Sequence, residues 1–212
     1  MNRKTEKILI VIYILSILSL IVAGTYAYFT VIKVSQVSPK IEVKSATTEV
    51  LSFNISKEIK IIADSENFSE NAGYLSSIAS VSAYMGITQD NPNYDVFTYT
   101  HYYNLKLDVN SNTFIYTTPD HKPELLLSII DPNDEVVTEL AGLEYKTING
   151  ASGFDITNLT EDLTIATHYK IETKTEVTHN WQIEVTLVNL DTNQNANIDK
   201  GFDAKLVIEK GD

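Results

Sequence analysis

The chain has 212 residues, a formal net charge of −12 at pH 7 and no cysteine. Without cysteine there can be no disulfide bond, thiolate catalysis or thiolate metal site, so the fold depends on its hydrophobic core. A surface this acidic repels nucleic acid and anionic lipid, and it favours divalent cations or cationic partners. We therefore expect no nucleic-acid partner.

The N-terminus has the organisation of an export signal. Basic residues in Met1–Lys7 precede the apolar run Ile8–Ala23, and the small residues Thr25 and Ala27 follow it. This order predicts a signal peptide cut after Ala27 and before Tyr28, with a signal peptidase and the export machinery as partners. The alternative is an uncleaved membrane anchor, because the apolar run spans about 25 Å against a hydrocarbon core of about 30 Å. Either way, the rest of the chain is expected outside the cell, secreted or at the cell surface.

The segment Ala23–Thr30, with the sequence AGTYAYFT, resembles the signal boundary of the TasA/camelysin group of Gram-positive exported proteins. That group is similar in its Gly-Thr-aromatic-Ala ending and in the aromatic residue shortly after it. The resemblance implies signal removal by a SipW-type peptidase, an extracellular sandwich or jelly-roll fold, and assembly into the matrix fibres of biofilms. Camelysin-like proteins have also been labelled metallopeptidases, which gives an enzymatic alternative.

Three parts are predicted along the chain: the signal or anchor at 1–27, an extended arm at 28–50 and a β-sandwich at 51–212. The arm mixes short apolar pairs with Ser, Thr and Lys and is interrupted by Pro39. It has neither a helical stripe nor strict alternation, which indicates an extended segment. From Leu51 onward alternate residues are apolar, as in strands that bury one side.

The longest alternating run is Val96–Val109, with Tyr99, His101 and Tyr103 on one side and Tyr102 on the other. This pattern predicts a half-buried antiparallel strand. Residues 75–85 fit both a strand and a helical face, and we favour the strand because the surrounding chain is strand. The other main predicted strands are 51–55, 59–61, 113–117, 125–130, 163–171, 181–187 and 202–208.

Turn signals separate these runs. Asn110–Asn112 and Asp131–Asp134 have turn composition, and Asn149-Gly150 suits a tight hairpin. About ten strands, with no long helix after the signal, predict an all-β fold. The expected architecture is an antiparallel β-sandwich, jelly-roll or immunoglobulin-like, preceded by the signal or transmembrane helix.

Two ligand sites are predicted from residue patterns. The first is a calcium loop that presents side-chain oxygens at every second position, namely Asp191, Asn193, Asn195, Asn197 and Asp199. Calcium is the one cofactor it suggests, and the same residues also fit a polar hairpin. The second is a glycan-stacking surface at Tyr94, Tyr99 and Tyr102, which ordinary cross-strand packing explains equally well.

The histidines do not form a recognised metal motif, since no His-Glu-x-x-His occurs. His121 and Glu124 lie three residues apart, but Pro123 between them prevents an ordinary helical zinc site. No Ser-His-Asp triad can be argued from the order of residues. We therefore predict a protein without catalysis.

The expected function is that of an exported cell-surface or extracellular-matrix structural protein that assembles into fibres by donating its N-terminal arm. Two alternatives remain: a camelysin-like secreted metallopeptidase, and a monomeric surface module that binds a glycan or another protein.

Overall fold

The computed structural model describes residues 42–44, 49–69, 72–87 and 98–211. The compact body of the chain is Lys40–Asp212. The predicted signal and most of the arm lie outside the described residues, as do Thr25, Ala27 and Tyr28 at the predicted cleavage site. Among the residues that are described, no helix is long and apolar enough to cross a membrane.

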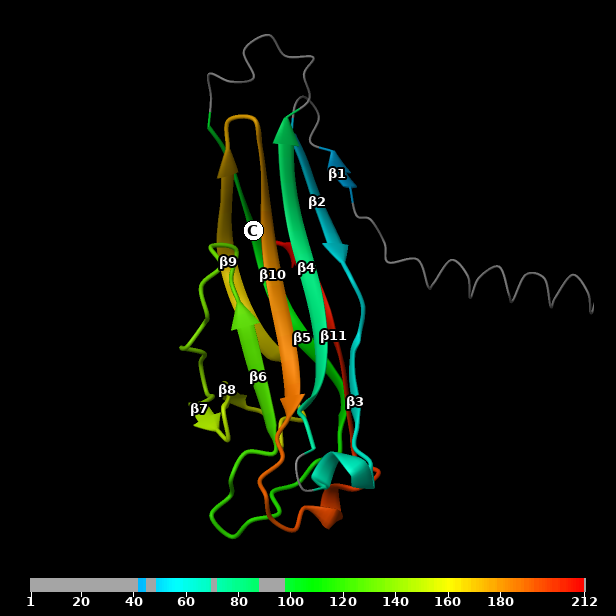
Figure 1. Ribbon diagram of the computed structural model, residues 1–212. Helices are drawn as coiled ribbons and strands as arrows, with labels where there is room; N and C mark the ends of the chain where they lie inside the picture. The colour runs from blue at the N-terminus through cyan, green and yellow to red at the C-terminus, as the bar shows by residue number, and fades with distance from the viewer. Residues whose placement is uncertain (1–41, 45–48, 70–71, 88–97, 212) are drawn as a thin grey trace, which may run out of the picture. The chain divides into compact units, whose positions relative to one another are not determined.

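The described residues of the body form two antiparallel sheets (Figure 1). The seven-stranded sheet contains, in spatial order, β1 (Glu42–Lys44), β2 (Glu49–Ile55), β4 (Leu75–Ile87), β10 (Glu176–Leu187), β6 (Leu125–Ile130), β8 (Ala151–Asp155) and β7 (Tyr145–Ile148). The four-stranded sheet contains β3 (Ile59–Ile62), β11 (Gly201–Lys210), β5 (Tyr99–Asn112) and β9 (Leu163–Thr173). Two short 3₁₀ helices, η1 (Ser65–Phe68) and η2 (Asn195–Asn197), lie between strands. The predicted antiparallel all-β class is confirmed.

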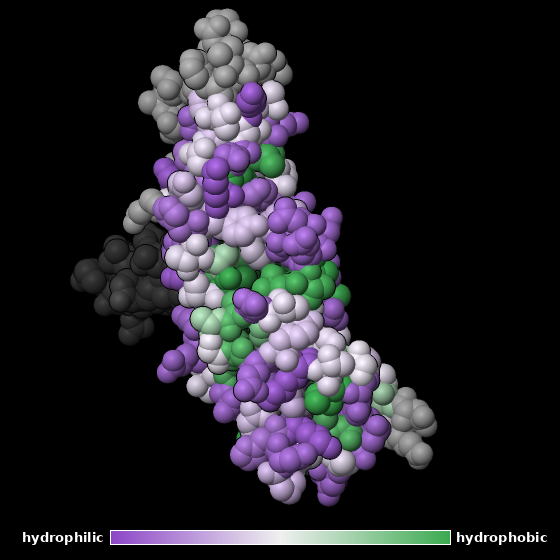
Figure 2. All heavy atoms as spheres, turned by 90° about the vertical axis from the view of Figure 1, so that its left-hand side faces the viewer, coloured by the Kyte–Doolittle hydropathy of each residue, from purple (hydrophilic) through white to green (hydrophobic). Residues whose placement is uncertain are grey.

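The strands follow the period-two pattern of the sequence. On β5, Tyr103, Leu105 and Leu107 are fully buried, while the residues between them are partly exposed. The ambiguous segment at 75–85 is strand, because β4 buries its alternate apolar residues, including Val81 and Met85. The pleat therefore separates one core side from one solvent side along both strands. Figure 2 shows hydrophilic residues over much of the surface that it presents, with smaller groups of hydrophobic residues between them.

One hydrophobic core lies between the two sheets. Its fully buried side chains come from both of them and include Met85, Leu127, Ile183, Leu105, Leu107 and Phe202. The rings of Phe53 on β2 and Tyr103 on β5 meet edge to face with centroids 6.2 Å apart. Each such side chain contributes about 1.5–3 kcal/mol on burial, so this core can hold a body that has no disulfide.

Two of the predicted turns are confirmed. At Asp131–Asp134 the Asp131 carboxylate accepts the backbone N–H groups of Asn133 and Glu135, which closes the turn after β6. At the hairpin between β7 and β8, Asn149 and Gly150 have φ of 49° and 92°. These positive values are those of a type I′ turn, whose twist matches that of the flanking strands.

The predicted turn at Asn110–Asn112 is wrong, as is the strand predicted at 113–117. Strand β5 continues to Asn112, which lies opposite Phe202 of β11 beyond a bulge. The Thr113 N–H still bonds to the Gly201 carbonyl of β11. Further along, backbone N–H groups bond to side chains instead: that of Ile115 to Asn197 Oδ1 and that of Thr117 to Glu124 Oε1. Side-chain acceptors thus replace the ladder that the sequence pattern suggested.

Candidate functional site

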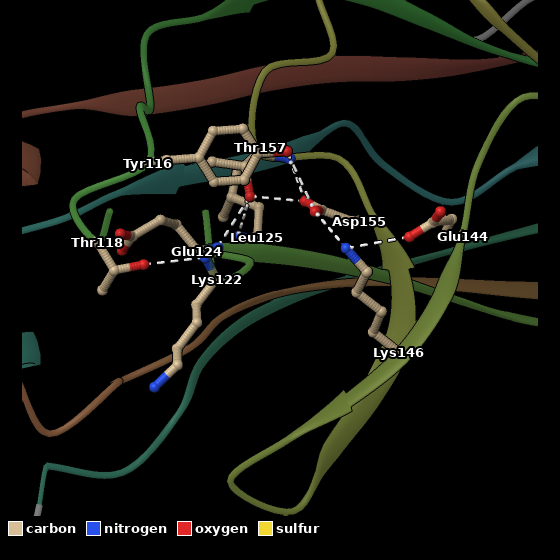
Figure 3. Close-up of polar contacts among 9 residues, drawn as sticks. All are labelled: Tyr116, Thr118, Lys122, Glu124, Leu125, Glu144, Lys146, Asp155 and Thr157. Atoms are coloured by element: carbon tan, nitrogen blue, oxygen red, sulfur yellow. Dashed lines mark hydrogen bonds and ion pairs between the residues drawn. The ribbon is translucent and has the colours of Figure 1, made fainter. Parts of the chain in front are cut away.

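A connected group of polar side chains lies beside β8 and the start of β6 (Figure 3). Asp155, at the end of β8, accepts hydrogen bonds on Oδ2 from the Tyr116 hydroxyl at 3.1 Å and from Lys146 Nζ at 3.5 Å. Lys146 also lies 3.3 Å from the exposed carboxylate of Glu144. The outer part of this network is therefore an ion-pair chain that ends in solvent.

Thr157 connects Asp155 to the interior. Its backbone N–H and its hydroxyl both donate to Asp155 Oδ1, at 3.1 and 2.8 Å. The same hydroxyl oxygen accepts the backbone N–H groups of Glu124 at 2.8 Å and Leu125 at 3.3 Å. One threonine thereby fixes the start of β6 to the end of β8.

Glu124 occupies the inner end of the network and has no exposed surface. One carboxylate oxygen accepts the backbone N–H of Thr117 at 2.8 Å together with the Thr117 hydroxyl. The other accepts the side-chain amide of Gln194, which is also fully buried. Gln194 in turn donates to the Val188 carbonyl and accepts the Leu190 N–H. The carboxylate is held by neutral donors from two separate loops, which compensates its removal from water.

At neutral pH, Tyr116 and Lys146 keep their protons and act as hydrogen-bond donors, not as groups that transfer protons. Burial, followed by the charge and hydrogen bond of Asp155, raises the pKa of Tyr116 to about 12. Burial opposes the charge on Lys146, but its contacts with Glu144 and Asp155 outweigh this and raise its pKa. A general acid or base works best with a pKa near the ambient pH, and neither group meets that condition.

A second polar group lies in the aromatic part of the core. The Trp181 indole N–H donates to the Tyr103 hydroxyl at 2.9 Å, and that oxygen lies 3.0 Å from His179 Nδ1. Tyr169 packs edge-on against Trp181 with ring centroids 5.0 Å apart. Burial raises the pKa of Tyr103 and lowers the pKa of His179, while the charge of Asp131 acts in the opposite direction on His179.

The other histidines contact carboxylate or aromatic groups. His101 on β5 pairs with Glu49 on β2 across the two sheets, with Nε2 and Oε2 2.6 Å apart. His121 stacks on Tyr116, while Glu124, three residues further along the chain, is bound by Thr117 and Gln194. Over the described part of the chain, no group of three or more His, Asp or Glu side chains could hold a metal ion.

The predicted calcium loop lies between β10 and β11. Asp191, Asn193, Asn195 and Asp199 are exposed, whereas the fifth predicted ligand, Asn197, is fully buried. Asn197 Oδ1 accepts the Ile115 N–H at 3.1 Å and Nδ2 donates to the Ile115 carbonyl at 2.8 Å. The structure thus separates Asn197 from the other four residues, and calcium binding stays a prediction.

The predicted glycan-stacking tyrosines do not share one surface. Tyr94 lies outside the described residues. Tyr99 packs against the core, and Tyr102, on the opposite side of β5, stacks on His168 with ring centroids 3.9 Å apart. The structure therefore does not bring Tyr99 and Tyr102 together into one platform.

Sequence reasoning missed the network of Glu124, Gln194 and Thr157 and the group formed by Tyr103, His179 and Trp181. In the first case the only sequence signal is a glutamate directly before the apolar run of β6. No protein-family model, no curated protein and no solved structure matches this chain.

Proposed function

We propose that the chain is an exported, non-catalytic structural protein of a cell surface or extracellular matrix, and that copies assemble when the arm of one adds a strand to the sheet of the next. The observation that carries the proposal is the pairing at the sheet edge. Residues Glu42, Val43 and Lys44 of the arm form β1, opposite Ser52, Leu51 and Val50 of β2. The arm thus takes the strand conformation that donation needs, and β2 provides the sheet edge on which such a strand docks.

The edge of β2 is longer than the strand that covers it. Within the described residues, β1 pairs with 50–52 only, although β2 continues to Ile55. A sheet edge with free backbone groups is a template for another strand. A longer segment from a neighbouring copy would therefore gain main-chain hydrogen bonds along the rest of β2.

The order of the strands supports a jelly roll over an immunoglobulin-like sandwich. The chain passes from one sheet to the other at each step from β2 to β6 and again at each step from β8 to β11, while β1–β2 and β6–β8 stay in the seven-stranded sheet. Successive strands of a double-sheet jelly roll alternate in this way, whereas immunoglobulin-like domains keep several successive strands in one sheet. The resemblance to TasA-like proteins implies a sandwich or jelly-roll fold, with which this choice agrees.

The polar networks support a structural role. The carboxylate of Glu124 is fully buried and accepts hydrogen bonds from Thr117 and Gln194, and Asp155 accepts bonds from Tyr116 and Thr157. These carboxylates hold loops to the sheets. Such internal contacts stabilise the body that presents the sheet edge.

Cysteine trapping in this cysteine-free chain tests the assembly. Glu42 and Ser52 lie directly opposite each other, which suits a disulfide. Two single variants, Glu42→Cys and Ser52→Cys, are exported separately, mixed and oxidised. We expect cross-linked dimers that contain one copy of each variant, because β1 of one copy then pairs with β2 of the other.

The double variant Glu42→Cys/Ser52→Cys is the control for pairing within one chain. Donation between copies predicts a ladder of oligomers from it on a non-reducing gel. Cross-linking confined to single chains, with no dimers in the mixture, would contradict the proposal. Val43→Pro removes one backbone N–H from β1, and it should reduce fibres seen by electron microscopy relative to Val43→Thr.

A further inference from the structure

The outer side of the seven-stranded sheet carries a set of uncharged polar side chains next to one exposed tyrosine, Tyr84. This side of the sheet faces the viewer in Figure 1. The polar residues alternate along β2, β4 and β10 with residues of the core, so they point to solvent. We call them the uncharged face: Asn54, Ser80, Ser82, Thr178, Asn180 and Gln182.

The register aligns these side chains in rows across three strands. Ser82 lies opposite both Asn54 and Asn180, and Ser80 lies opposite Gln182. With strands about 4.8 Å apart and a rise of about 3.4 Å per residue, the face extends roughly 10 Å across and 14 Å along the sheet. This area can receive more than one ring of a linear polymer.

Tyr84 lies flat on the sheet at one end of the uncharged face. A methyl group placed on Gly86 would stand 2.3 Å from the Tyr84 hydroxyl oxygen and 2.7 Å from the adjacent ring carbon. Gly86 therefore leaves the space in which the tyrosine ring rests. The hydroxyl donates to Glu176 Oε2 at 3.2 Å and holds the ring along the strand. The residue is 36% exposed, so part of the ring is accessible for stacking.

None of the six side chains of the uncharged face carries a charge, although 21% of the residues in the chain are charged. On β10 the two acidic residues, Glu176 and Glu184, flank Thr178, Asn180 and Gln182. These carboxylates would repel an anionic ligand. A neutral ligand could bind on the uncharged face without removing any charged side chain of that face from water. Hydroxyl and amide groups both donate and accept hydrogen bonds, so they match a ligand rich in hydroxyl groups.

We propose that the uncharged face binds a neutral polysaccharide, with one sugar ring stacked on Tyr84 and adjoining rings hydrogen bonded to Ser82, Asn180 and Gln182. A pyranose ring has an apolar C–H side that packs on an aromatic ring, and hydroxyl groups around its edge. The inference goes beyond a structural role, because it names a glycan to which the protein attaches. It does not depend on assembly, since strand donation uses the edge of the sheet and leaves this side free.

The test is retention of the full-length chain on insoluble polysaccharides. The protein is kept in solution with a detergent that has no sugar headgroup and is incubated with cellulose, chitin or cross-linked polygalacturonate. We expect retention on a neutral polymer and none on the anionic one. Tyr84→Ala should weaken binding about tenfold or more, since stacking on an aromatic ring is worth that much. Tyr84→Phe keeps the ring and should retain binding.

A matched tyrosine separates this surface from the one predicted at β5. Tyr102→Ala removes a ring stacked on His168 in the other sheet and should bind as the unchanged protein does. Gln182→Glu puts a charge on the uncharged face at an exposed position and should weaken binding without loss of folding, as judged by Trp181 fluorescence. Two results would overturn the proposal: no retention on either neutral polymer, or retention that Tyr84→Ala and Gln182→Glu leave unchanged.

Discussion

The carboxylate of Glu124 accepts a hydrogen bond from the side-chain amide of Gln194, 70 residues further along the chain, and neither side chain has exposed surface. The contact joins the start of β6 to the loop between β10 and β11. The Glu124 carboxylate is the acceptor in each of these hydrogen bonds. A side chain at this position must therefore present hydrogen-bond acceptors and no donor.

Glu124→Gln should therefore destabilise the fold. The new amide would point its N–H₂ group at a donor, either Gln194 Nε2 or the Thr117 N–H. An unsatisfied buried donor costs about 1–3 kcal/mol, and each kcal/mol lowers the melting temperature of a domain this size by about 2–4 °C. Thermal unfolding followed by circular dichroism measures the change. Glu144→Gln, at a side chain that is 81% exposed, is the control, and equal melting of both variants would refute the role of Glu124.

Tyr103→Phe should also lower stability, because it removes the oxygen that accepts the Trp181 N–H and contacts His179. The buried indole N–H would lose its partner, at a cost of about 1–3 kcal/mol. Trp181 is the single tryptophan of the chain, so its fluorescence during denaturant unfolding reports this site directly. Tyr102→Phe changes a tyrosine on the other side of β5 and should unfold like the unchanged protein. A midpoint shared by both variants would speak against this hydrogen bond.

The strands were predictable because their signal is local. Period-two alternation placed Tyr103 and Leu107 on the buried side of β5, and Asn149-Gly150 marked a tight turn by its own backbone preference. Glu124 was not predictable, because its burial depends on Thr117 and Gln194, which meet it only in the folded chain. The turn predicted at 110–112 failed for the same reason.

Stability should fall as the pH drops below about 6.5, the ordinary pKa of histidine. Burial lowers the pKa of His179 in the folded protein, so the unfolded chain takes up this proton first. The stabilising effect is present above the unfolded pKa and is lost as the pH falls towards the folded pKa. The backbone N–H groups of Glu135 and Asn133 outweigh burial and lower the pKa of Asp131, so its contribution is lost only in more acidic solution.

Melting curves between about pH 7.5 and 5.0 test this assignment. This range contains the ordinary pKa of histidine and stays above the ordinary pKa values of carboxylates. His179→Gln should flatten the decline of melting temperature over that range, because it removes the titrating group. His121→Gln changes an exposed histidine and should leave the decline as it is. A decline of the same slope in all three proteins would assign the effect to another group.

Gly153→Ala should destabilise the contact between β6 and β8. A methyl group on Gly153 would stand 2.6 Å from the carbonyl oxygen of Leu127 and 2.8 Å from its carbonyl carbon. These are backbone atoms of the neighbouring strand, so the strands must move apart, at a cost of about 1–3 kcal/mol. Gly73→Ala is the matched control, because nothing lies within 4 Å of its methyl group. Chemical denaturation of both variants gives the comparison, and equal free energies of unfolding would contradict the clash.

Asn197 gives a prediction that separates the structural and calcium roles of its loop. Its buried amide makes two hydrogen bonds to the backbone of Ile115, so Asn197→Ala should lower the melting temperature equally in calcium and in chelator. Asp199→Asn changes an exposed side chain. It should lower the melting temperature in calcium only if calcium binds the loop, since a ligand stabilises the state that binds it. Melting curves of the three proteins in both buffers decide the matter. If the unchanged protein melts at the same temperature in calcium and in chelator, the calcium site predicted from the sequence is wrong. If calcium restores the melting temperature that Asn197→Ala loses, the structural role of Asn197 is contradicted.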